Sequence, residues 1–187
     1  MIVHIKDKHY KEKQIFSNRI FDFASDGVSI VKAPSGYGKT TLLRIISSLD
    51  RDYEGFIEDP PCFPVVVFQE DRLVENLSVE ANLRAVSKDR NLIRHLLSEV
   101  GLIDEIDNKV NELSGGMKRR VSIIRALLLD YDWLLLDEPF QGLDDVLCKK
   151  LSSLILSFSK GKGLIVITHD DRDVRLFGGK VIELERE

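Results

Sequence analysis

Residues 28–41 read VSIVKAPSGYGKTT, and this stretch decides the fold of the chain. The run 28–32 is strand-like, and the glycine-rich segment after it leads into residues 39–48, which have helical periodicity. A loop between a strand and a helix points several backbone N–H groups, and the positive end of the helix dipole, at one place. We therefore predict a phosphate-binding loop made of Ala33, Pro34, Ser35, Gly36, Tyr37, Gly38, Lys39, Thr40 and Thr41.

Two side chains of this loop carry most of the expected chemistry. The Lys39 ammonium is expected to contact the β- and γ-phosphates of a nucleotide, and the Thr40 hydroxyl suits coordination of Mg²⁺. The usual pattern begins with glycine, whereas this chain has Ala33 there; the other required positions match. The alternative interpretation is an ordinary glycine-rich turn between a strand and a helix.

An acidic pair follows a second apolar run. Asp137 and Glu138 come directly after Leu134–Leu136. Nucleotide sites in open α/β sheets lie at the carboxyl edge of the strands, so we expect Asp137 in the Mg²⁺ shell and Glu138 beside the water that attacks the γ-phosphate. A solvated acidic turn after a buried strand is the alternative.

A second glycine-rich helix start occurs between these motifs, where residues 113–120 read LSGGMKRR. Ser114 is expected to cap the helix and, with Gly115 and Gly116, to leave its N-terminal amides open to an anion. The helix expected over 115–129 is about 22 Å long, so we do not expect one chain to close both glycine sites on one ATP. Two chains arranged head to tail in a twofold dimer would do so. An ordinary capped helix is the alternative.

The order of the expected elements indicates the fold class. Strand-like runs precede a region, 72–112, that has none, and strands alternate with helices beyond it, which favours a parallel sheet. We predict an α/β P-loop NTPase fold with a mostly parallel sheet core, an antiparallel N-terminal β portion and a small inserted helical lobe. The expected arrangement is one domain over 1–187, with its core in 1–71 and 120–187 and its helical lobe roughly in 72–119. The expected strands are 2–6, 14–23, 28–32, 53–58, 64–68, 133–136, 164–168 and 180–184, and the expected helices are 39–48, 91–101, 115–129 and 143–158.

Composition limits the class of protein. The chain has 187 residues, 43% of them hydrophobic, which suits one domain with a substantial core. Its 31 acidic and 27 basic residues give a net charge of −4, so we expect no nucleic acid partner. The two cysteines, Cys62 and Cys148, lack metal-type spacing and are expected to be reduced and structural. No run approaches the ~20 apolar residues that span a bilayer, so a membrane role would require docking to another chain.

With these motifs in this order, the chain resembles the nucleotide-binding subunits of ATP-binding cassette (ABC) transporters over nearly its whole length. The resemblance implies ATP and Mg²⁺ as cofactors and gives roles to residues that the spacing alone does not assign. Tyr10, 23 residues before Ala33, matches the aromatic that stacks on adenine, with Phe16 as a second candidate. The resemblance further implies that Gln69 contacts Mg²⁺ and the attacking water, that Asp144 faces the dimer partner, and that His169 bonds the γ-phosphate.

The same resemblance implies a motor that closes as a homodimer or heterodimer on ATP and opens after hydrolysis. Its expected partners are a second ATPase subunit, integral membrane permease subunits and a substrate-binding protein, and its expected location is cytoplasmic, at the inner face of the membrane. The runs LSGGM and EPF resemble importers of the nitrate, sulfonate and taurine kind. The alternatives are a non-transport ABC ATPase acting on a macromolecular complex and a P-loop kinase or GTPase. The latter would leave Ser114 and His169 unexplained.

Overall fold

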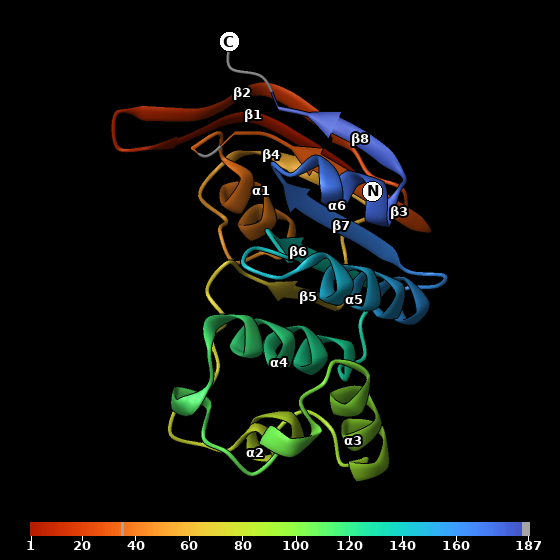
Figure 1. Cartoon of the computed structure of the whole chain (residues 1–187). Coiled ribbons are helices and arrows are strands. Elements are labelled where there is room, and N and C mark those ends of the chain that lie inside the picture. Colours follow the sequence, from red (N-terminus) through yellow and green to blue (C-terminus); the bar gives the residue numbers. More distant parts are fainter. Residues whose placement is uncertain (35, 185–187) are drawn as a thin grey trace. The chain divides into compact units, whose positions relative to one another are not determined.

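The computed structural model describes residues 1–34 and 36–184 (Figure 1). Ser35, part of the predicted phosphate loop, lies outside the described residues. The strands are β1 (Ile2–Tyr10), β2 (Lys13–Asp22), β3 (Gly27–Lys32), β4 (Glu54–Glu58), β5 (Pro64–Val67), β6 (Trp133–Asp137), β7 (Gly163–Thr168) and β8 (Lys180–Glu183). The helices are α1 (Lys39–Ile46), α2 (Val79–Arg84), α3 (Arg90–Glu99), α4 (Gly115–Leu127), α5 (Asp145–Phe158) and α6 (Asp171–Phe177), with short 3₁₀ helices η1 (Ile103–Glu105) and η2 (Val110–Glu112).

The chain divides into two compact units. The first comprises Met1–Val66, Tyr131–Glu138 and Ser159–Glu187, and the second comprises Val67–Asp130 and Pro139–Phe158. The second unit takes in α4, which packs with α2 and α3, and α5, which packs with α4.

The first unit contains the antiparallel sheet that was predicted for the N-terminal part. Its strand order is β2-β1-β4, and both pairings are antiparallel. Its inner face contributes buried side chains such as Val3, Ile5 and Phe16 to a core that also includes Leu42 and Leu43 of α1. This sheet therefore packs against the helix that begins at the phosphate loop.

A mostly parallel sheet in the order β5-β6-β7-β3-β8 forms the rest of the predicted architecture. Strands β6 and β7 are buried at every position, which explains why they read as continuous apolar runs. The register pairs Lys32 of β3 with Thr168 of β7, and Asp137 of β6 with Ile167 of β7. The carboxyl ends of β3, β6 and β7 thus meet at one edge, where the predicted site lies.

The second unit is held together by polar side chains of α4 as well as by apolar packing. The Arg119 guanidinium, 4% exposed, donates from Nε to the Pro139 carbonyl at 3.0 Å and from Nη1 to the Phe68 carbonyl. Ser122 donates to the Asp71 carbonyl at 3.1 Å, and Arg125 donates to the Arg72 carbonyl at 2.8 Å. These side chains fix the non-helical segment 68–72, which contains Gln69, against α4.

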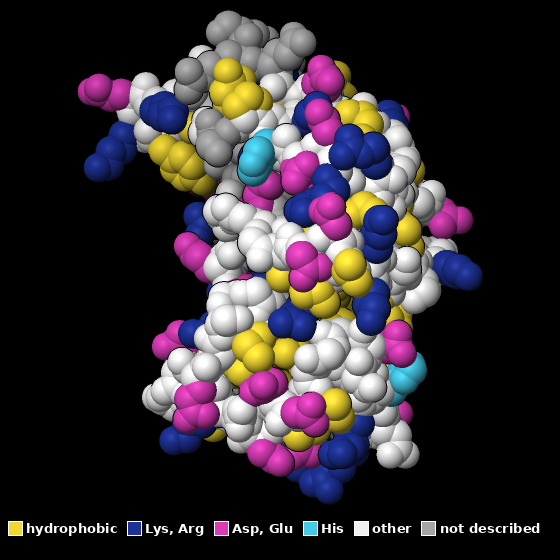
Figure 2. Space-filling model, in the orientation of Figure 1, with side chains coloured by type: hydrophobic (Ala, Val, Ile, Leu, Met, Phe, Trp, Pro, Cys, Tyr) yellow, Lys and Arg dark blue, Asp and Glu magenta, His cyan; other side chains and the backbone are white. Residues whose placement is uncertain are grey.

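The visible surface carries both signs of charge. Figure 2 shows Lys and Arg side chains interspersed with Asp and Glu over the face it presents. Within the described ranges, no helix has the length and apolar content required to span a membrane.

The amino end of β7 contains a close approach that requires glycine. Gly163 pairs with Trp133, and a Cβ built on Gly163 would lie 2.3 Å from Cδ2 of the indole, which is buried. We predict that Gly163→Ala lowers the free energy of unfolding by about 1–3 kcal/mol through overpacking, as measured by denaturant titration. Combining it with Trp133→Leu should cost less than the sum of the two single changes. Strict additivity would show that the indole is not the cause.

Candidate functional site

The phosphate loop packs against β2 at a position that only glycine fits. Gly38 stands at the N-cap of α1 with φ +85°, and no side chain caps the helix there. A Cβ on Gly38 would lie 2.7 Å from Ile15 Cγ2 and from Phe16 Cζ, both buried or partly buried in the core. The first amides of α1 are therefore left open, as an anion site requires. Gly36 also has φ +85°, as expected for a curled loop.

The buried centre of the site is an ion pair. The Lys39 ammonium lies 2.7 Å from Glu138 Oε1, with only 8% and 9% of the two side chains exposed. It also donates to the Ala33 carbonyl at 2.8 Å, and His169 Nδ1 lies 2.8 Å from the same Glu138 oxygen. The structure thus joins three residues that the sequence had placed in separate motifs, around one carboxylate.

The environment of Glu138 favours its ionised form. Burial opposes ionisation, but the hydrogen bonds with His169 and Lys39 outweigh it and lower the pKa of this carboxyl below its ordinary value. The Glu138 backbone has φ +48°, a left-handed conformation that non-glycine residues seldom adopt. Its N–H donates to the Ile167 carbonyl at 2.9 Å, which holds this conformation in place. Strained backbone of this kind is concentrated at functional sites.

Two oxygen ligands suited to a hard cation lie together beside this pair. The Thr40 hydroxyl donates to Asp137 Oδ2 at 2.8 Å, and Asp137 is 2% exposed at the end of β6. No group of three or more His, Cys, Asp or Glu that could hold a metal is found among residues 1–34 and 36–184. A hydroxyl with one carboxylate fits Mg²⁺, which is commonly bound by one or two carboxylates together with phosphates and waters.

A second buried carboxyl lies close to Glu138 and was not predicted. The Thr168 hydroxyl lies 3.4 Å from Glu138 Oε2 and donates to Asp173 Oδ2 at 2.8 Å. Asp173 is 2% exposed, and burial raises the pKa of its carboxyl. Thr168 thus connects the site to α6, which also was not predicted. The acidic residues 170, 171 and 173 after His169 were the available signal, because Asp170 caps the helix and Asp171 lies in its first turn.

The two aromatic candidates for the nucleotide base differ in exposure. Tyr10 ends β1, is 41% exposed and donates from its hydroxyl to Asp50 Oδ2 at 2.5 Å. Phe16 is 3% exposed and packs edge-on against Phe21, with ring centroids 5.7 Å apart. Phe16 is therefore a core residue, and Tyr10 is left as the candidate.

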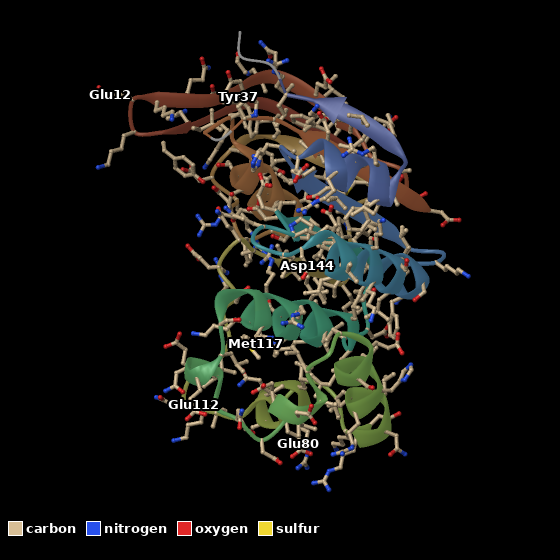
Figure 3. All side chains as sticks on the ribbon, in the orientation of Figure 1. Glu12, Tyr37, Glu80, Glu112, Met117 and Asp144 are labelled. Atoms are coloured by element: carbon tan, nitrogen blue, oxygen red, sulfur yellow. The ribbon has the colours of Figure 1, made fainter. Side chains whose placement is uncertain are left out.

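The second unit contains the other glycine-rich helix start. The Ser114 side chain accepts from Met117 N at 3.3 Å, so it caps α4 as predicted. A Cβ on Gly116 would lie 3.2 Å from Leu143 Cδ2, while one on Gly115 would meet no atom within 4 Å. Asp144, labelled with Met117 in Figure 3, accepts from Val146 N and Leu147 N, both at 2.9 Å, and so starts α5. The helix start and the Asp144 loop are therefore neighbours within this unit.

Gln69 also lies in the second unit and is exposed. Its amide donates to Gln141 Oε1 at 3.1 Å. The bonds from Arg119 to the Phe68 and Pro139 carbonyls flank this contact, because they hold residue 68 before Gln69 and residue 139 after Glu138. The sequence predicts Arg119 only as part of the helix 115–129, because it gives no sign of what the side chain contacts.

Comparison with known proteins gives a consistent result. A family model described as "ABC transporter" matches residues 18–141. The aliphatic sulfonates import ATP-binding protein SsuB 2 of Burkholderia cenocepacia is 35% identical, over 97% of this chain and 72% of that protein. SsuB 1 of Pseudomonas savastanoi is 33% identical over 97% of this chain and 79% of that protein. The taurine import ATP-binding protein TauB of Jannaschia sp. is 37% identical over 86% of this chain and 66% of that protein.

Solved structures agree. The ATP-binding cassette MJ0796, in a dimeric post-hydrolysis state bound to ADP and phosphate, matches with a TM-score of 0.80 and 28% identity over 99% of this chain and 94% of that one. The archaeal ribosome recycling factor aABCE1 matches with a TM-score of 0.78 and 29% identity, over 90% of this chain but 34% of that one. These matches agree with the phosphate loop, the acidic end of β6 and the capped start of α4. The chain belongs to the ABC transporter family and is one of its ATP-binding ATPase subunits.

Proposed function

We propose that the chain is one of two ATPase subunits of an ABC importer. We further propose that its two compact units are parts of one ATPase domain. The observation that carries the proposal is the Glu138 carboxylate, held by Lys39 and His169 beside Thr40 and Asp137. This arrangement contains a base, a cation for phosphate and two ligands for a metal ion at the end of a helix dipole, as hydrolysis of a phosphoanhydride requires.

Each site residue of the first unit has a role in this proposal. The backbone N–H groups of the loop 33–41, other than Pro34, which has none, bind the phosphate oxygens, and Lys39 neutralises the β- and γ-phosphates. Glu138 orients the attacking water and accepts its proton, because its pKa keeps it ionised at neutral pH. His169, on the same carboxylate oxygen, bonds the γ-phosphate and holds the hydrolytic geometry. Tyr10 stacks on the adenine.

Thr40, Asp137 and Gln69 would hold Mg²⁺. A bound ion would supply positive charge that neutralises the phosphates during hydrolysis. The mutual approach of Thr40 and Asp137 supports this assignment from within the first unit. Gln69 is assigned to the Mg²⁺ site because of the resemblance to the family. It lies on the segment 68–72, which side chains of α4 hold in place.

The second half of the ATP site is proposed to come from a partner copy. Ser114, Gly115 and Gly116 at the start of α4, with Asp144 beside them, would face the γ-phosphate bound to the other subunit. The exposure of Ser114 and Gly115 and the dimeric state of the related cassette MJ0796 support this arrangement. Hydrolysis then removes the ligand that the two subunits share, so closure loses its advantage.

The relatives indicate the transport complex. Three of them are named as import ATP-binding proteins for aliphatic sulfonates or taurine. We therefore propose integral membrane permeases of the sulfonate type as partners, at the inner face of the membrane, and a small organic sulfonate as cargo.

Deleting the gene should abolish growth on a sulfonate as sole sulfur source while leaving growth on sulfate intact. Unimpaired growth on the sulfonate would rule out this cargo.

Replacing the proposed base separates binding from chemistry. We predict that Glu138→Gln binds ATP yet lowers kcat by at least about 100-fold, the contribution typical of general-base catalysis. The measurements are steady-state ATPase rates and the mass of the protein in ATP by light scattering, where a dimer should accumulate. Glu99→Gln on the exposed face of α3 is the matched control and should keep wild-type turnover. Normal turnover by Glu138→Gln would remove Glu138 from this role.

Removing the loop cation tests the phosphate site itself. We predict that Lys39→Ala weakens ATP binding by roughly 10- to 100-fold, because a charge-assisted hydrogen bond contributes about 1.5–3 kcal/mol. Isothermal titration calorimetry measures the change. Lys162→Ala is the control, because Lys162 lies just before the amino end of β7, whereas the proposed site lies at the carboxyl end. The Lys162 ammonium lies over the Tyr131 ring. Equal affinities for Lys39→Ala and wild type would contradict the assignment.

A further inference from the structure

A fully buried lysine lies beneath the exposed tyrosine of β1. Lys8 is 1% exposed, and none of its side chain reaches solvent. Its ammonium lies 4.3 Å from the centroid of the Tyr10 ring, while Tyr10 itself remains 41% exposed. One face of the ring thus lies against a cation, while the residue as a whole keeps part of its surface in solvent. Lysine is rarely buried to this extent without a specific partner.

The partner of Lys8 is an aspartate that also binds Tyr10. The Lys8 ammonium lies 3.0 Å from Asp50 Oδ1, and the Tyr10 hydroxyl donates to Asp50 Oδ2 at 2.5 Å. The ammonium donates in addition to the Asp52 carbonyl at 2.5 Å. Burial opposes ionisation of Asp50, but its hydrogen bonds with Tyr10 and Lys8 prevail and lower the pKa of the carboxyl. The carboxylate therefore stays charged and fixes both groups.

The three residues are anchored to the helix of the phosphate loop. Asp50 follows α1, and its backbone N–H donates to the Arg44 carbonyl of that helix at 3.0 Å. The same helix begins at Lys39. The orientation of the Tyr10 ring is thus set by the end of the element whose start binds phosphate, within one compact unit.

We propose that Lys8 and Asp50 are positioning residues for the nucleotide base. Asp50 fixes the ring of Tyr10 through its hydroxyl, and the Lys8 ammonium attracts one face of the ring. Because its hydroxyl is bonded and one face lies against the ammonium, the ring is held in one orientation before the base arrives, which lowers the ordering cost of stacking. This inference rests on the proposed role of Tyr10 in stacking on adenine.

A purely structural role would have a different signature. If Lys8 only tied β1 to residues 50–52, its loss would weaken all nucleotide contacts alike or only lower stability. A positioning role predicts loss of affinity for ATP but not for tripolyphosphate, which has the phosphates and lacks the base. The two roles therefore separate in a comparison of these two ligands.

The test uses the full chain with Lys8→Met combined with Asp50→Asn, so that no charge is left buried without a partner. We expect this double variant to bind ATP roughly three- to tenfold more weakly by calorimetry, with KM raised, kcat unchanged and tripolyphosphate affinity unchanged. Tyr10→Phe, which keeps the ring and loses the hydroxyl, should show a smaller loss of the same kind. Lys6→Met is the matched control, because Lys6 lies on the same strand, exposed and paired with Glu54.

The outcomes distinguish the inference from the function on which it rests. Unchanged ATP affinity in the double variant, or equal losses for ATP and tripolyphosphate, overturns the positioning role. If Tyr10→Ala weakens ATP binding while the double variant does not, the inference alone fails and the role of Tyr10 stands. If Tyr10→Ala leaves ATP affinity intact, both fail together. Should the double variant not fold, Tyr10→Phe decides by the same comparison of ligands.

Discussion

The Lys39 ammonium and the Glu138 carboxylate lie 2.7 Å apart with almost none of either side chain in contact with solvent. Burying either charge alone would cost several kcal/mol, so the pair is tolerable only if its geometry is held closely. The two residues come from the loop after β3 and the end of β6, and β7 lies between these strands. The register of β7 against both neighbours therefore fixes the separation of the two charges. A change in that register would shift the carboxyl ends of β3 and β6 relative to each other and separate the two charges.

The parts of this arrangement that sequence predicts are those with a local cause. The strands β3, β6 and β7 are mainly apolar because both faces of a parallel sheet are covered, and they were expected within one residue of their observed limits. Ser114 was expected as a cap because hydroxyls satisfy the free amides of a helix start, and the structure confirms it. The helix expected from residue 143 begins instead at Asp145, because the Asp144 side chain caps it.

What escaped prediction depends on partners distant in sequence. Lys8 lies beyond the strand expected over 2–6, and only the fold brings Asp50 to it. Arg119 on a helix reads as a surface residue, yet its guanidinium reaches carbonyls at positions 68 and 139. The helix α6 is seven residues long, too short for a clear periodic pattern. Because α6 was not predicted, neither Asp173 nor the Thr168 hydroxyl, which lies between Asp173 and Glu138, was expected at the site.

The side chains of Ile15 and Phe16 lie directly against the glycine that starts α1. The antiparallel sheet therefore packs against the phosphate loop and also contains Tyr10. A chain shortened to begin at residue 24 would keep every loop residue but lose the strand that Gly38 packs against. The position of the loop relative to β6 would then no longer be fixed. A change of side chain at residue 15 or 16 would therefore alter the phosphate loop from outside it, with the loop sequence unchanged.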